Sequence, residues 1–224
     1  MLDKSKVKEY FDATALIKDK INIVGCGSIG SHLAELFARQ GVESVELYDF
    51  DVVSAHNITN QMFFAEDIGT AKVDAVEKMM LAINPDIKVI KHEKGLEEPF
   101  TLNGFVFLCV DNIELRKKIV EANRFNPNVV AFFDFRTRLT DSQCYAAKRA
   151  DARQMKALLE SMNFTHEEVL EETPVSACGV ELNVVDVIKV TTSIGFANFR
   201  NFVKTGELKV SAIIDMENLL IDVI

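Results

Sequence analysis

The sequence predicts a doubly wound α/β fold, with a mostly parallel sheet, helices on both faces and an antiparallel extension at the C-terminal end. Three observations predict it. Short apolar segments alternate with segments of helical periodicity through the first two thirds of the 224 residues. Residues 105–110 are apolar throughout, which is typical of a strand in the centre of a parallel sheet. Apolar residues make up 48% of the chain, enough to bury a core.

The strands are predicted as short apolar runs. In the first two thirds of the chain these runs are 21–24, 45–48, 87–90, 105–110 and 129–133. The last third differs and is expected to add strands at 143–147, 209–215 and 219–223, the last two as a hairpin about Met216-Glu217. We expect this part to be a smaller antiparallel extension on the same core, so that residues 1–224 form a single domain.

The helices are predicted from apolar residues that recur every three or four positions. Residues 32–40 place such residues on one face, and Gly41 ends the segment. Residues 70–83 also place apolar residues on one face, and Asn84-Pro85 ends this predicted helix. The other segments expected to be helical are 4–18, 113–123, 151–162 and about 179–202. Residues 49–68 have little periodicity, and a loop of that length favours a functional role.

Composition excludes several classes of protein. The formal net charge of −9 disfavours nucleic acid as the main partner. The N-terminus has no apolar signal region, and no apolar stretch is long enough for a membrane span. The four cysteines lie far apart without a CxxC pair, which argues against a zinc ribbon and against a disulfide scaffold. The sequence therefore indicates a cytoplasmic protein with reduced thiols, no nucleic-acid partner and no membrane segment.

A glycine-rich turn predicts a Rossmann-like nucleotide site. Gly25-x-Gly27-x-x-Gly30 follows a predicted strand and opens a predicted helix, which is the context that this motif requires. The first glycine permits a tight turn, the second lets the backbone approach a phosphate, and the third lets helix and strand pack closely. Asp49 ends the second strand nineteen residues after Gly30, where it can accept hydrogen bonds from a ribose.

The residues after the turn separate ATP from NAD. In chain order they are Asp49-Phe50-Asp51-Val52-Val53, Asn57-Ile58-Thr59-Asn60-Gln61, Asp67-Ile68-Gly69-Thr70-Ala71-Lys72, Asn84-Pro85, and Asp111-Asn112 followed by Arg116. This order resembles the ThiF/MoeB/HesA family, the adenylating domain of ubiquitin-activating-enzyme-like proteins. The resemblance is close over residues 20–135, the expected nucleotide-binding core, and weaker over the C-terminal helix and hairpin of residues 136–224.

The resemblance implies a function. Members of the family use ATP and Mg²⁺ to adenylate the C-terminal carboxylate of a ubiquitin-like or sulfur-carrier protein or peptide, and pyrophosphate leaves. Residues that match the ATP-binding motifs are Gly25, Gly27, Ser28, Ile29, Gly30, Asp49, Asp51, Asn57, Gln61 and Lys72. Among them Asp49 matches the ribose-binding acid and Lys72 the phosphate-contacting lysine. Asp111 matches the acid that holds Mg²⁺, and it could also cap the helix at 113. The family also implies a homodimer.

The sequence departs from the family at one position that matters for chemistry. Asn60 stands where the family has an arginine that neutralises phosphate charge in the transition state, and asparagine cannot replace a cation. Arg136, Arg138 and Arg116 are the candidate substitutes. A solvated or salt-bridging role is the more common one for such residues. Residues 1–20 contain five lysines and no arginine, so they cannot supply an arginine to a partner subunit.

Cys178 is the candidate thiol for a transfer step after adenylation. It lies before the last long helix, where some relatives carry an acyl-accepting cysteine, and a helix N-terminus would lower its pKa. The alternative is a small buried residue at the start of a helix. Cys26 and Cys109 are expected to be structural, and Cys144 is left open.

Three functions therefore remain. The first is ATP-dependent adenylation of a carrier, with Asp111 and Lys72 as the main catalytic residues. The second is a non-catalytic member of the fold that binds a nucleotide or a carrier tail and acts as a scaffold, because the arginine is missing. The third is an NAD-dependent oxidoreductase, which would bind NAD and have no use for Lys72.

Overall fold

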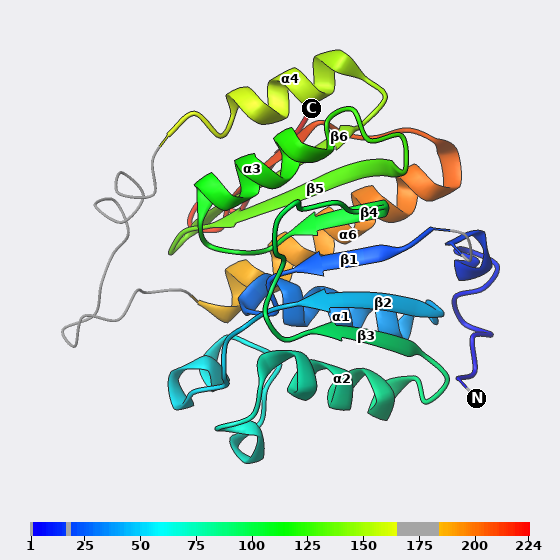
Figure 1. Ribbon diagram of the computed structural model, residues 1–224, viewed down its shortest axis with the longest axis vertical. Coiled ribbons are helices and arrows are strands. Elements are labelled where there is room, and N and C mark those ends of the chain that lie inside the picture. The colour runs from blue at the N-terminus through cyan, green and yellow to red at the C-terminus, as the bar shows by residue number, and fades with distance from the viewer. Residues whose placement is uncertain (1, 17–18, 165–183) are drawn as a thin grey trace.

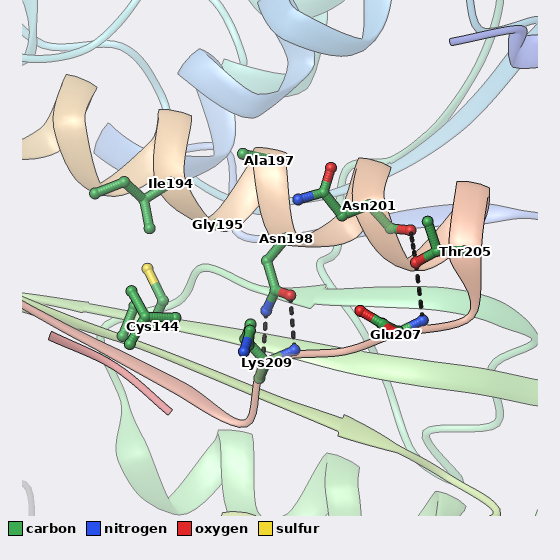
Figure 2. Close-up of a pocket in the computed structure, with 11 residues that line it drawn as sticks. Cys144, Ile194, Gly195, Ala197, Asn198, Asn201, Thr205, Glu207 and Lys209 are labelled. Carbon is green, nitrogen blue, oxygen red and sulfur yellow. Dashed lines mark hydrogen bonds between the residues drawn. The ribbon is translucent and has the colours of Figure 1, made fainter. Parts of the chain in front are cut away.

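The structure is a computed structural model that describes residues 2–16, 19–164 and 184–224. Its strands join one sheet in the order β3-β2-β1-β4-β5-β6-β7-β8 (Figure 1). Strands β3, β2, β1, β4 and β5 are parallel, and β6, β7 and β8 continue the sheet in antiparallel pairing. The predicted α/β fold with a mostly parallel sheet and an antiparallel C-terminal part is confirmed.

The strands run close to their predicted positions. Their bounds are β1 (Ile21–Val24), β2 (Ser44–Tyr48), β3 (Lys88–His92), β4 (Gly104–Leu108), β5 (Val129–Thr137), β6 (Asp141–Lys148), β7 (Ser211–Asp215) and β8 (Leu220–Val223). β4 is buried along its whole length, as its apolar sequence requires in the middle of a sheet. β5 extends four residues past its predicted end because Asp134 and Arg136 continue the pairing with β6.

Helices cover both faces of the sheet (Figure 1). Their bounds are α1 (Ser28–Arg39), α2 (Lys72–Ile83), α3 (Ile113–Asn123), α4 (Ala152–Glu160) and α6 (Val185–Thr205). Buried side chains of α1, α2 and α6 share one core cluster, and those of α3 and α4 share another on the opposite face. No helix among the described residues is both long and apolar enough to cross a membrane.

Phenylalanine rings fill the larger core cluster. Phe107 of β4 lies 5.1 Å from Phe37 of α1, 5.0 Å from Phe133 of β5 and 5.3 Å from Phe199 of α6, measured between ring centroids. All four side chains are at most 1% exposed. Edge-to-face and stacked pairs at these distances add to the free energy that ring burial contributes. This packing holds the N-terminal helix α1 and the C-terminal helix α6 on the same strand surface.

Three segments differ from the prediction. Residues 4–18 were expected to be helical, but within the described part only Ala13–Leu16 form a short 3₁₀ helix (η1), and residues 5–10 form turns. α1 begins at Ser28, so the glycine turn overlaps the first turn of the helix. The loop at 49–68 contains two 3₁₀ helices, η2 (Ala55–Thr59) and η3 (Ala65–Asp67). Residues 179–183 of the predicted last helix lie outside the described residues.

The strand register brings four chain segments to one level at the carboxyl edge of the sheet. Val24 at the end of β1 pairs with Tyr48 of β2 and with Leu108 of β4, and Leu108 pairs with Asp134 of β5. The residues that follow these four positions therefore converge. Ligands of open α/β sheets bind at this edge, where the strand order reverses.

Candidate nucleotide site

The glycine turn is fixed by close packing at two of its three glycines. Gly25 has φ of +96°, and a Cβ there would lie 2.8 Å from the backbone of Cys109 and Val110. A Cβ on Gly30 would lie 1.9 Å from the carbonyl oxygen of Gly25. Only glycine fits either position. These contacts lock the turn between the start of α1 and the end of β4.

Gly27, the middle glycine, faces open space. A Cβ built on this residue would meet no atom within 4 Å. It is the N-cap of α1, and no side chain caps that end of the helix. The first N–H groups of α1 are therefore available to an anion, which the helix dipole also favours. The turn thus leaves an open cradle beside Gly27 with the character of a phosphate site.

Asp49 ties the second strand to the turn. Its carboxylate accepts hydrogen bonds from the backbone N–H of Cys26 (2.6 Å) and of Asp51 (2.8 Å). Burial raises the pKa of this carboxyl above its ordinary value, and the two backbone hydrogen bonds work in the opposite direction. Each carboxylate oxygen keeps further acceptor capacity. Asp49 can therefore hold the turn and also accept a ribose hydroxyl.

Lys72 lies at the start of α2 and pairs with Asp51. The Nζ–Oδ2 distance is 2.7 Å, and the side chain of Lys72 is 10% exposed against 50% for Asp51. The backbone reinforces the pair, because Lys72 N–H donates to the Asp51 carbonyl and Val52 forms a bridge with Ala71. A buried lysine whose partner is a half-exposed carboxylate can exchange that partner for a phosphate.

Asp67 anchors the loop that leads to Lys72, a role that the motif alone does not reveal. Its side chain is 3% exposed and accepts from the backbone N–H of Phe64 (2.8 Å) and from Lys78 (2.8 Å). Its own carbonyl accepts from the hydroxyl of Thr70 (2.6 Å). The signal in the sequence was an acidic residue three positions after Phe64, the spacing of a helix-capping interaction.

Asn57 and Gln61, expected to line the phosphates, lie on and just after η2. The Oδ1 of Asn57 accepts from the backbone and the hydroxyl of Ser54, both at 2.9 Å, so this oxygen caps η2. The Oε1 of Gln61 is buried and has no hydrogen-bond partner among the described residues. The next residue, Met62, donates its N–H to the hydroxyl of Ser31 on α1 (3.1 Å), which ties η2 to the cradle.

Asp111 follows β4 at the same edge. It is exposed, and its carboxylate has no hydrogen-bond or ion-pair partner within the described parts of the chain. The alternative role as a helix cap belongs to its neighbour, because the side chain of Asn112 accepts from Leu115 N–H (2.8 Å). Asp111 is therefore free to bind a cation. No group of three or more metal-ligating side chains occurs in the described residues, so a metal ion held by Asp111 would take its other ligands from water or a substrate.

Two of the three candidate arginines are engaged with a buried carboxylate. Arg116 and Arg136 both donate to Asp134, at 2.6 and 2.7 Å. Arg136 also donates to the carbonyl and the hydroxyl of Ser161 (2.7 and 2.9 Å) and stacks on the ring of Tyr145. Arg138 is exposed on the turn between β5 and β6. Asn60, at the family arginine position, ends η2.

The cysteines that the structure describes are shielded. Burial raises the pKa of Cys26, Cys109 and Cys144, so little thiolate exists at neutral pH. Cys178 lies outside the described residues.

We expect iodoacetamide at pH 8 to spare Cys26, Cys109 and Cys144 in the native protein and to label them after denaturation, as peptide mass mapping would detect. Rapid native labelling of Cys26 would contradict this assignment.

Comparison with known proteins gives one family. A sequence model of the ThiF family matches residues 9–163. Ubiquitin-like modifier-activating enzyme 5 of Drosophila willistoni is 30% identical over 131 residues, which are 50% of this chain and 31% of that protein. The same enzyme of Drosophila virilis is 30% identical over 147 residues, 57% of this chain and 35% of that one. The chain thus spans about a third of the length of these curated relatives.

Solved structures have the same fold. Escherichia coli MccB with ATP superposes with a TM-score of 0.71 at 17% identity, covering 95% of this chain and 65% of MccB. The complex of MccB with N-formylated MccA gives a TM-score of 0.72 at 18% identity, covering 95% of this chain and 66% of that one.

Proposed function

The chain belongs to the ThiF family, and from this premise we propose that it binds ATP with Mg²⁺ at the carboxyl edge of its sheet. We propose further that it adenylates the C-terminal carboxylate of a ubiquitin-like or sulfur-carrier protein or of a peptide. Residues 1–224 would act as a single adenylating domain. Solved neighbours support this direction, since one structure of MccB contains ATP and another contains N-formylated MccA.

The observation that carries the proposal is the open cradle at Gly27 between two charged residues of the right kinds. The cradle provides backbone N–H groups for phosphate oxygens. Lys72, paired with Asp51 after β2, is a cation with an exchangeable partner, and Asp111 after β4 is a carboxylate without one. Strands β2 and β4 are the two neighbours of β1, which the cradle follows. An NAD enzyme has no evident use for this lysine and acid.

In the proposed reaction a carboxylate oxygen of the carrier attacks the α-phosphorus of ATP. The bond from that phosphorus to the bridging oxygen of the β-phosphate breaks, and pyrophosphate leaves with the bond electrons. Asp49 would orient the ribose, the N–H groups at the start of α1 and Lys72 would hold the phosphates, and Asp111 would hold Mg²⁺. A Mg²⁺ ion held there would neutralise phosphate charge and so favour the approach of an anionic nucleophile.

A scaffold without catalysis is the second candidate, and one observation favours it. Asn60 replaces the family arginine, and the guanidinium groups of Arg116 and Arg136 are both engaged with Asp134. Such a protein would bind ATP with Mg²⁺ and would catalyse no pyrophosphate exchange.

A homodimer, expected from the family, is part of the first proposal. Light scattering that gives the mass of one 25.1 kDa chain would refute the homodimer.

Pyrophosphate exchange tests the chemistry. We expect labelled pyrophosphate to enter ATP when the protein is given Mg²⁺ and a carrier protein or peptide that ends in Gly-Gly. Asp111→Ala should abolish the exchange and leave the melting temperature unchanged, because Asp111 is exposed and unpartnered. Asp222→Ala, on the exposed strand β8, is the matched control and should exchange normally. Tight ATP binding by the parent without exchange across such carriers would favour the scaffold.

Lys72→Ala provides a separate test of the ATP site. Loss of a charged hydrogen bond to phosphate should weaken ATP binding by about 1–3 kcal/mol, measured by calorimetric titration. Lys156→Ala is the control, because Lys156 is exposed on α4 and pairs only with Glu160 of the same helix. Equal ATP affinity in the parent and in Lys72→Ala would remove Lys72 from the site.

A further inference from the structure

A buried charged cluster adjoins the segment that carries Asp111. Asp134 of β5 is 0% exposed, and its two oxygens accept from Arg116 (2.6 Å) and Arg136 (2.7 Å). The side chains of the two arginines are 7% and 14% exposed. Burying charge is costly unless it is paired, so a cluster of this kind needs a reason beyond stability.

Arg116 differs from Arg136 in what else it holds. Its Nε donates to the carbonyl oxygen of Val110 (2.6 Å), and one of its terminal nitrogens donates to the same oxygen. The other terminal nitrogen, besides binding Asp134, donates to the carbonyl of Phe135 (2.5 Å). One rigid guanidinium thus joins the end of β5 to the segment that follows β4. Lysine, with a single nitrogen, could not make this set of contacts.

Val110 is also held at its amide end. A Cβ on Gly25 would lie 2.8 Å from the amide nitrogen of Val110, so the glycine turn packs directly against this segment. Gly25 packs on the peptide unit between Cys109 and Val110, and Arg116 holds the carbonyl of the next one, the peptide unit before Asp111. Its position relative to the cradle is set by these two contacts.

We infer that Arg116, oriented by Asp134, is a positioning residue that sets where Asp111 stands relative to the phosphate cradle. The inference rests on the proposed function, in which Asp111 holds Mg²⁺. Arg116 touches neither nucleotide nor metal in this role; it acts through the Val110 peptide. Groups that orient a metal ligand change metal affinity by about 10–100-fold when they are replaced.

Two lysine substitutions test the role. Arg116→Lys keeps the positive charge beside Asp134 and loses the double contact with Val110. Arg136→Lys makes the same change on the other side of Asp134, where no contact with Val110 exists. We expect the Mg²⁺ concentration that half-saturates ATP binding to rise about 10–100-fold in Arg116→Lys and to stay within a few-fold of the parent in Arg136→Lys. Equal Mg²⁺ dependence in the two variants would overturn the inference.

Amide hydrogen exchange without nucleotide separates this inference from the proposed function. Peptides that cover residues 108–113 should exchange faster in Arg116→Lys than in Arg136→Lys, with the strands of the sheet unchanged. Unchanged exchange there would refute the positioning role even if ATP binds. Absence of Mg²⁺-dependent ATP binding in the parent would refute the proposed function. The amide hydrogen exchange of residues 108–113 would still decide the role of Arg116.

A double variant keeps the test open if Arg116→Lys does not fold. Arg116→Met with Asp134→Asn removes both charges of this pair, while Arg136 keeps its hydrogen bonds to Ser161 and can donate to the amide oxygen introduced at position 134. It should fold, show the same faster exchange at 108–113 and show the same weakened Mg²⁺ dependence. A folded double variant with parental exchange and parental Mg²⁺ dependence would overturn the inference.

Discussion

We expect Gly27→Ala to lose ATP affinity by at least about tenfold, or about 1.4 kcal/mol, without losing the fold. The added methyl group projects into the open cradle, where no protein atom lies within 4 Å. The backbone of this glycine is where a phosphate must approach closely. A methyl group at that point takes the space of a phosphate oxygen but collides with nothing in the protein itself.

Gly30→Ala is the matched control for that result. Its methyl group would lie 1.9 Å from the Gly25 carbonyl oxygen, so the helix and the turn must separate. Thermal unfolding should show a much larger loss of melting temperature for Gly30→Ala than for Gly27→Ala. Parental ATP affinity in a folded Gly27→Ala would mean that the phosphates do not bind at this turn.

The largest effect on stability is expected for Asp134→Ala. This change leaves the guanidinium groups of Arg116 and Arg136 without their carboxylate in a nearly buried position. Breaking a buried ion pair in this way costs about 3–5 kcal/mol. For a domain of this size, 1 kcal/mol corresponds to roughly 2–4 °C, so the melting temperature should fall by roughly 10 °C.

Glu66→Ala provides the comparison for an exposed ion pair. Glu66 pairs with Lys78 at 2.5 Å, but both side chains are more than half exposed. Solvent screens such pairs, and we expect a melting temperature close to that of the parent. A similar melting temperature for Asp134→Ala and the parent would show that the buried cluster contributes little to the fold.

The sheet could be predicted from the sequence because its signals are local. The apolar run at 105–110 and the glycine turn after 21–24 place β4 and β1, and the parallel order follows from the helices between strands. The ends of the strands could be predicted less well. β5 continues through Asp134 and Arg136 because β6 pairs with it, and no local pattern marks a charged residue as part of a buried strand.

Only part of the candidate site could be predicted from the sequence. Its backbone cradle follows from three glycines whose spacing has a direct steric meaning. The ion pair between Arg116 and Asp134 could not be predicted, because the two residues lie eighteen positions apart in the sequence. They come into contact only because β4 and β5 pair in a particular register. The N-cap of α3 is Asn112, one position after Asp111, which the sequence offered as a possible cap. Asn112 is adjacent to the first helical residue, which leaves Asp111 outside the helix.

The loop between Asp49 and Lys72 illustrates the same limit at shorter range. Its lack of periodicity correctly indicated an irregular segment. The two 3₁₀ helices inside it depend on side-chain contacts with nearby backbone, from Asn57 to Ser54 and from Asp67 to Phe64. Residues of these types favour local hydrogen bonds over regular helix or strand, so their presence indicates caps but not which carbonyl or amide they reach.

Calorimetric titration of the purified protein with ATP, with and without Mg²⁺, is the decisive test of the nucleotide site, with NAD as the control ligand. We expect saturable ATP binding that strengthens with Mg²⁺ and no saturable binding of NAD. Saturable binding of NAD in place of ATP would contradict the account and favour an oxidoreductase. No binding of either nucleotide would also contradict it, and would leave the ThiF fold without the nucleotide that its cradle is proposed to hold.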